Sequence, residues 1–103
     1  MSKKDESILR MLDLIDLTRH GWRTTDNWDG DLAAVGIASV SDSARLVYVS
    51  TFEMPPGLFY YECECVHGTA PEDSETLETR DGATLDELLS ALVRHLGLVK
   101  QVV

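Results

Sequence analysis

Three apolar, β-branched stretches follow one another in the middle of the chain and are separated only by short turn sequences. They are LAAVGIASV (32–40), RLVYVSTFE (45–53) and LFYYECECV (58–66), and the separators are SDSA and MPPG. β-Branched and aromatic residues favour strands, and connections this short join antiparallel neighbours. The sequence therefore predicts a three-stranded antiparallel meander.

The positions of the turns predict which side chains share a face of this sheet. A turn centred on Asp42-Ser43 places Ile37 opposite Tyr48, and a turn centred on Pro55-Pro56 places Tyr48 opposite Cys63. Because side chains alternate along a strand, one face should carry Ala33, Val35, Ile37, Leu46, Tyr48, Phe52, Phe59, Tyr61, Cys63 and Cys65. The other face should carry a half-apolar set, namely Leu32, Ala34, Gly36, Ala38, Val40, Val47, Val49, Thr51, Tyr60 and Val66, with Glu62 and Glu64 among them.

Helical periodicity flanks the strands on both sides. Apolar residues at helical spacing predict an N-terminal helix over 5–19, ended by Gly21, and a C-terminal helix over 85–96, ended by Gly97. TLDE at 84–87 is a capping box with Thr84 as the N-cap. We predict a two-layer α+β domain spanning residues 1–103, made of an N-terminal helix, the meander and a C-terminal helix.

The remaining segments are polar. Residues 21–31 are expected to form a connection, and 67–83 an acidic polar loop with room for a short extra strand around ETLETR (75–80). The C-terminal LVKQVV is expected to add a short strand or a tail.

Charge is the property that most restricts the partners of the chain. Eighteen acidic residues oppose nine basic ones, which gives a formal net charge of −9. Such a surface repels nucleic acid and anionic membranes and attracts basic proteins, although it also serves solubility alone. With no long apolar run and no signal-peptide pattern, the chain is expected to be cytoplasmic, without nucleic-acid or membrane partners, as a monomer or a homodimer.

Cys63, Cys65 and His67 alternate along the third predicted strand and raise the question of a metal site. In an extended strand the two cysteines stand roughly 6.5–7 Å apart, at or beyond the limit for a disulfide. Three ligands of this kind suit zinc, but structural zinc sites use cysteine pairs on turns and a fourth ligand. Core packing is the favoured interpretation, the Cys63, Cys65 and His67 metal or thiol site is the weaker alternative, and no cofactor is expected.

Motifs with catalytic spacing are missing from the sequence. DNWDGD (26–31) fails the calcium-loop pattern in both frames, and no phosphate-binding glycine motif is present. The leading hypothesis is a small non-enzymatic protein-binding module, in its most concrete form an inhibitor or immunity-type protein that masks a basic partner. The alternatives are a chaperone or adaptor that uses the half-apolar sheet face, and a Cys/His thiol or metal protein.

The residues expected to contact a partner are of two kinds. Trp and Tyr dominate the energetics of interfaces, and acidic side chains steer a basic partner. The predicted contact residues are Trp22, Asp26, Trp28, Asp29, Asp31, Tyr60, Glu62, Glu64, Glu72, Asp73, Glu75 and Glu78.

Overall fold

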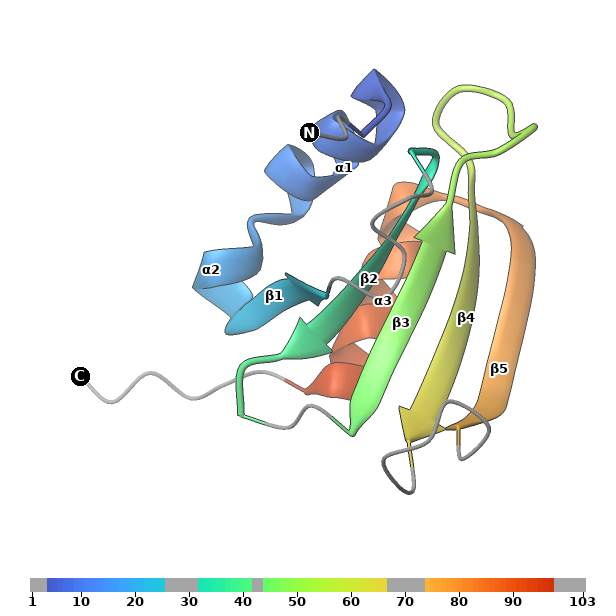
Figure 1. Ribbon diagram of the computed structural model, residues 1–103. Helices are drawn as coiled ribbons and strands as arrows, with labels where there is room; N and C mark the ends of the chain where they lie inside the picture. The colour runs from blue at the N-terminus through green and yellow to red at the C-terminus, as the bar shows by residue number, and fades with distance from the viewer. Residues whose placement is uncertain (1–3, 26–31, 42–43, 67–73, 98–103) are drawn as a thin grey trace.

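Five antiparallel strands form one sheet in the order in which they occur in the chain (Figure 1). The computed structural model describes residues 4–25, 32–41, 44–66 and 74–97. The strands are β1 (Trp22–Thr25), β2 (Ala34–Ser39), β3 (Arg45–Ser50), β4 (Phe59–Val66) and β5 (Ser74–Ala83), and the helices are α1 (Glu6–Ile15), α2 (Leu17–His20) and α3 (Leu85–Leu96). The α+β class is confirmed, and the predicted meander forms the middle of a larger sheet.

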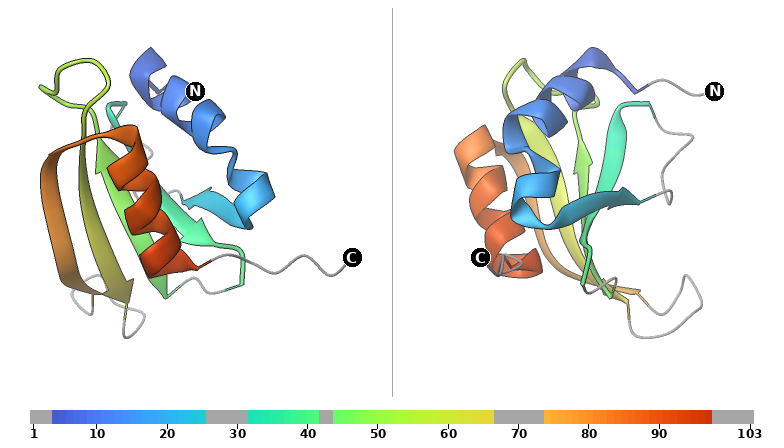
Figure 2. Two further views of the ribbon diagram at one scale, coloured as in Figure 1. Left: turned by 180° about the vertical axis from the view of Figure 1, so that it is seen from behind. Right: turned by 90° about the vertical axis from the view of Figure 1, so that its left-hand side faces the viewer.

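All three helices lie on one side of the sheet, which gives two layers (Figure 2). The core lies between these layers, where side chains from α1 and α3 meet alternate residues of β2, β3 and β4. Its largest fully buried members are Tyr61, Ile8, Met11, Ile37, Leu88, Leu92, Val47 and Val49. No helix in the described part of the chain is long and apolar enough to cross a membrane.

The predicted N-terminal helix is interrupted at Asp16. This residue adopts a left-handed conformation with φ 58°, ends α1 and accepts a hydrogen bond from the backbone of Arg19 in α2. Aspartate tolerates this conformation better than most residues because its short polar side chain bonds locally. Gly21 then ends α2 with φ 77°, as predicted.

The C-terminal helix is confirmed from end to end. The Thr84 hydroxyl accepts from the Glu87 backbone at 3.2 Å, and the Glu87 carboxylate accepts from the Thr84 backbone at 3.0 Å. Gly97 follows the last helical residue, and its backbone N–H donates to Val93. The helix therefore begins and ends where its sequence signals lie.

The predicted strand register is wrong by one residue. Val47, not Tyr48, lies opposite both Ile37 and Cys63. In each hairpin an odd number of residues lies between two paired positions, whereas the predicted pairing had an even number. This difference of one residue turns the side chains of β3 to the face opposite to the predicted one. In the β3–β4 loop, Glu53 and Gly57 adopt positive φ values of 56° and 86°. Val47 and Val49 consequently face the core, while Leu46 and Tyr48 face away from it.

Two segments that were predicted to be a connection and a loop form strands in the structure. Trp22–Thr25, expected to begin a connection, is β1, which pairs with the end of β2. Ser74–Ala83, expected to belong to the acidic loop, is β5, which includes the short strand anticipated over 75–80. The register of β5 against β4 shifts twice, and this accommodates Leu77 and the Asp81-Gly82 pair. Residues 67–73 and the C-terminal 98–103 lie outside the described part of the chain.

Candidate functional site

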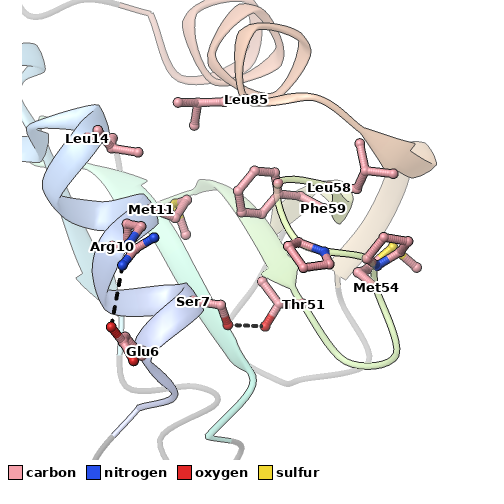
Figure 3. Close-up of a pocket in the computed structure, with 13 residues that line it drawn as sticks. Glu6, Ser7, Arg10, Met11, Leu14, Thr51, Met54, Leu58, Phe59 and Leu85 are labelled. Atoms are coloured by element: carbon pink, nitrogen blue, oxygen red, sulfur yellow. Dashed lines mark hydrogen bonds and ion pairs between the residues drawn. The ribbon is translucent and has the colours of Figure 1, made fainter.

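A pocket of about 470 Å³ opens between α1, the β3–β4 loop and the start of α3 (Figure 3). Its walls are mostly apolar side chains, and a hydrogen bond of 2.8 Å between the Ser7 and Thr51 hydroxyls joins α1 to the end of β3. The sequence pattern gave no sign of this pocket, because its residues come from three separate segments. The predicted contact residues that the structure describes, namely Trp22, Tyr60, Glu62, Glu64, Glu75 and Glu78, do not line it.

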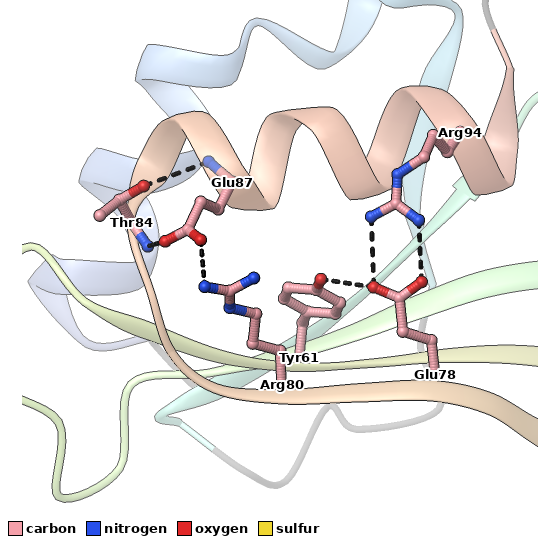
Figure 4. Close-up of polar contacts among 6 residues, drawn as sticks. All are labelled: Tyr61, Glu78, Arg80, Thr84, Glu87 and Arg94. Atoms are coloured by element: carbon pink, nitrogen blue, oxygen red, sulfur yellow. Dashed lines mark hydrogen bonds and ion pairs between the residues drawn. The ribbon is translucent and has the colours of Figure 1, made fainter.

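A polar network fixes α3 to the sheet on the helix side (Figure 4). Arg94 donates two hydrogen bonds to the Glu78 carboxylate, at 2.9 and 3.2 Å, and the Tyr61 hydroxyl donates to the same carboxylate at 2.6 Å. These donors lower the pKa of Glu78 to about 2. Glu78, predicted to contact a partner, is therefore held by its own chain.

A second ion pair lies at the other end of the same helix. Arg80 of β5 pairs with Glu87, the residue that completes the capping box with Thr84 (Figure 4). Arg94 and Arg80 thus form ion pairs with Glu78 and Glu87, so that each of these carboxylates, one on β5 and one on α3, has an arginine as a partner.

The opposite side of the sheet, which we call the open face, carries none of the three described helices (Figure 2). Cross-strand pairing places Tyr48 beside Glu62, Leu46 beside Glu64 and Ser50 beside Tyr60. β5 continues two of these rows, with Thr79 opposite Glu62 and Thr76 opposite Glu64. Ala34 and Ala38 of β2 are fully buried, whereas Tyr48, Tyr60, Glu62 and Glu64 are partly exposed. The accessible tyrosines and glutamates of this face therefore lie over β3 and β4, beside the exposed threonines of β5.

These four partly exposed residues, Tyr48, Tyr60, Glu62 and Glu64, form what we call the Tyr–Glu patch. The two tyrosine rings meet edge to face with centroids 6.3 Å apart. The Tyr60 hydroxyl donates to the Glu62 carboxylate at 2.7 Å, and this bond together with burial raises the pKa of Tyr60 to about 12. The rings are thus held in place while part of their surface stays accessible.

No cation among the described residues balances the carboxylates of the patch. In the described ranges, no arginine or lysine lies within ion-pair distance of Glu62 or Glu64, and the nearby Asp81 adds negative charge. The pKa of Glu64 is raised, first by burial and then by the charge of Glu62. Arg23 also faces this side, but it lies on β1, opposite Ala38 and distant from β4. The patch is consequently a site of unneutralised negative charge.

Of the other predicted contact residues, Trp22 is a core residue. It is only 2% exposed, its indole N–H donates to the Gly97 carbonyl at 2.7 Å, and its ring stacks on His20. It therefore joins β1 to the end of α3 and offers no ring face to a partner. Glu75 lies opposite Cys65 on β5. Several predicted residues lie outside the described part of the chain: Asp26, Trp28, Asp29, Asp31, His67, Glu72 and Asp73.

The two cysteines occupy different environments and are both free thiols. Cys63 is 2% exposed and belongs to the core, as predicted, while Cys65 is half-buried near the end of β4. Burial, followed by the charge of Glu78, raises the pKa of Cys63 to about 11, which keeps it protonated. No group of three metal-ligating side chains occurs among the described residues, a set that excludes His67.

Sequence reasoning found three members of the Tyr–Glu patch and missed Tyr48. It identified Tyr60, Glu62 and Glu64 but assigned Tyr48 to the core, because the predicted register placed it on the wrong face. The signal that could have corrected this was the strict alternation of Leu46, Tyr48 and Ser50 with the more uniformly apolar Val47 and Val49.

Comparison with known proteins found no family model, no curated protein and no solved structure that matches the chain.

Proposed function

We propose that this protein is a non-enzymatic binding module that holds a basic partner protein against the Tyr–Glu patch. The single observation that supports this function is the unequal treatment of carboxylates on the two sides of the sheet. Glu78 and Glu87 are paired with arginines on the helix side, whereas Glu62 and Glu64 have no described cation. An interface would supply the missing positive charge.

The tyrosines give such an interface its apolar part. Tyr48 and Tyr60 present ring surface beside the two carboxylates, and Tyr60 is fixed through its hydrogen bond to Glu62. Arginine side chains combine well with this chemistry, since a guanidinium stacks on an aromatic ring and pairs with a carboxylate. An inhibitor or immunity-type protein that covers a basic surface is the most concrete form of this proposal.

The alternative of a chaperone or adaptor has less support in its original form. It relied on Val47, Val49 and Tyr60 as a half-apolar exposed face, and both valines are fully buried in the core. Only Tyr60 of that set is accessible. The charged character of the patch favours a basic partner over an apolar extended segment.

The test is a comparison of two double variants that carry the same net charge. Glu62→Gln/Glu64→Gln neutralises the patch, and Glu53→Gln/Asp86→Asn removes two exposed charges elsewhere. Proteins captured from a lysate are identified at low and moderate salt, and the affinity of the purified partner is then measured. We expect a basic partner that binds the wild type and the control alike, and the patch variant at least about tenfold more weakly.

Salt dependence gives a second readout of the same experiment. Binding through unneutralised carboxylates should weaken as ionic strength rises. Equal losses in both double variants would show that bulk charge alone attracts the partner and would contradict a defined patch. Full binding by the patch variant would contradict the proposal outright.

A further inference from the structure

The pocket between α1 and the β3–β4 loop has the size and lining of a small-molecule site. Its volume of about 470 Å³ lies in the range of ligand pockets, which are mostly apolar with a few polar groups. Met11 and Leu14 of α1 face Phe59 and the β3–β4 loop, and Leu85 lies at the start of α3 (Figure 3). Pro55 and Pro56 form a wall with little conformational freedom.

The charged groups at the pocket are one cation and one anion. Arg10 and Glu6 lie one helical turn apart on α1, and the guanidinium Nη2 is 3.5 Å from the Glu6 Oε1. Their side chains are 73% and 87% exposed, and an exposed pair of this kind is weak because water screens it. Both groups therefore remain available to a ligand at little energetic cost.

We propose that this pocket binds a free apolar α-amino acid, with its side chain between Leu14, Leu58 and Leu85 above the buried Met11 and Phe59, its carboxylate on Arg10 and its ammonium on Glu6. The inference is independent of the proposed partner surface, which lies on the other side of the sheet. The hydroxyls of Ser7 and Thr51 are bonded to each other at 2.8 Å and add further polar atoms to the pocket.

Three physical reasons favour a zwitterion over a ligand with one charge. The nitrogen and carboxylate carbon of an α-amino acid are about 2.5 Å apart, so its two charges are close enough together to reach neighbouring groups such as Arg10 and Glu6, whose Nη2 and Oε1 atoms are 3.5 Å apart. A ligand with one charge would satisfy one group and separate it from the other. In addition, a neutral ligand avoids repulsion from a chain whose net charge is −9, which a simple anion would experience.

The experiment titrates isotope-labelled full-length protein with four probes that share one phenyl group. L-Phenylalanine carries both charges, 3-phenylpropanoate only the carboxylate, 2-phenylethylamine only the ammonium, and 2-phenylethanol neither. Backbone amide shifts of Met11, Phe59 and Leu85 report binding in the pocket. We expect L-phenylalanine to shift these amides and to bind at least about threefold more tightly than each of the other probes, since one exposed charge contact is worth about this much.

Variants at the two charged positions identify the source of this preference. Arg10→Gln and Glu6→Gln should each reduce the advantage of L-phenylalanine over 2-phenylethanol by about threefold, because each leaves the other charge contact in place. Both residues are too exposed for the substitutions to disturb folding. Arg23→Gln, which removes an arginine from the open face, should retain the full advantage.

Three outcomes would overturn the proposal. In the first, L-phenylalanine leaves the pocket amides unshifted. In the second, 3-phenylpropanoate or 2-phenylethylamine binds as tightly as L-phenylalanine. In the third, the preference for L-phenylalanine over 2-phenylethanol is undiminished in either the Arg10→Gln or the Glu6→Gln variant.

Discussion

Glu78 connects three elements of the structure through one carboxylate. It belongs to β5 and accepts hydrogen bonds from Tyr61 of β4 and from Arg94 of α3. Tyr61 is 1% exposed, so its hydroxyl needs this acceptor to avoid an unsatisfied buried donor. The side chain thus stabilises the packing of α3 against the edge of the sheet.

We predict that Glu78→Gln lowers the free energy of unfolding by about 1 kcal/mol at pH 7, because a charge-assisted pair becomes a neutral one at a partly exposed position. The measurement is urea unfolding followed by circular dichroism. Glu53→Gln, at an exposed loop position, is the matched control and should change stability little.

The same substitution should change the response of stability to acid. The pKa of Glu78 is lowered from 4.5 to about 2, so the folded state binds its proton less readily than the unfolded state. The wild type should therefore lose this contribution as the pH falls from about 4.5 towards 2, and Glu78→Gln should lack that part of the loss. Parallel stability curves over this range would contradict the assigned role of Glu78.

At the scale of elements, α3 is the helix whose boundaries are best specified. Its N-terminus has reciprocal hydrogen bonds between Thr84 and Glu87, and Arg80 pairs with the same glutamate. The first turn of α3 also borders the apolar pocket through Leu85. Loss of the cap should therefore be felt in stability and at the pocket.

Thr84→Ala should lower the free energy of unfolding by about 1 kcal/mol, since the hydroxyl that accepts from the Glu87 backbone is removed. Ser90→Ala, an exposed position within α3, removes a hydroxyl without removing a cap and is the control. Denaturant midpoints of the two variants provide the comparison. A loss of similar size in both would mean that the cap contributes nothing specific.

Elements with strong local signals could be predicted from sequence, and their pairing could not. The α3 helix has apolar periodicity, a cap box and a terminal glycine, so its range is correct. The facing of β3 depends on whether each turn holds an odd or even number of residues, which the turn sequences do not reveal. Tyr48 was therefore assigned to the core and Val47 to the surface, the reverse of what the structure shows.

β5 was predicted only in part, as a short strand over 75–80, for a different reason. Its sequence SETLETRDGA is rich in charge, and two register shifts interrupt the alternation that identifies a strand. Gly82, with φ 73°, adopts a backbone conformation that other residues rarely take and permits the second irregularity. Trp22 was predicted to contact a partner because of its residue type alone. Its indole in fact bonds to Gly97, which follows α3 and lies 75 positions further along the chain, a contact that the local sequence does not reveal.

On the scale of the whole molecule, charge is distributed unevenly between the two sides of the sheet. The described ion pairs of β5 and α3 lie with the helices, and the carboxylates of the Tyr–Glu patch lie on the open face without a described cation. Removing charge from the open face should therefore weaken binding to a positively charged surface more than removing the same amount of charge elsewhere.

Anion-exchange chromatography tests this without any partner. Glu62→Gln/Glu64→Gln should elute at lower salt than Glu53→Gln/Asp86→Asn, although both carry the same net charge, because the first removes charge from the face that contacts the resin. Circular dichroism establishes that both variants are folded. Identical elution, or later elution of the patch variant, would show that the open face does not dominate the electrostatic field.

The irregular edge strand has a consequence for the behaviour of the protein at high concentration. A straight edge offers a row of unpaired backbone groups on which another chain can add a strand, the first step towards fibrils. β5 forms one edge of this sheet, and its two register shifts and its acidic side chains make it a poor template, while β1 at the other edge is only four residues long. We therefore expect this five-stranded meander to resist polymerisation through its own sheet edges.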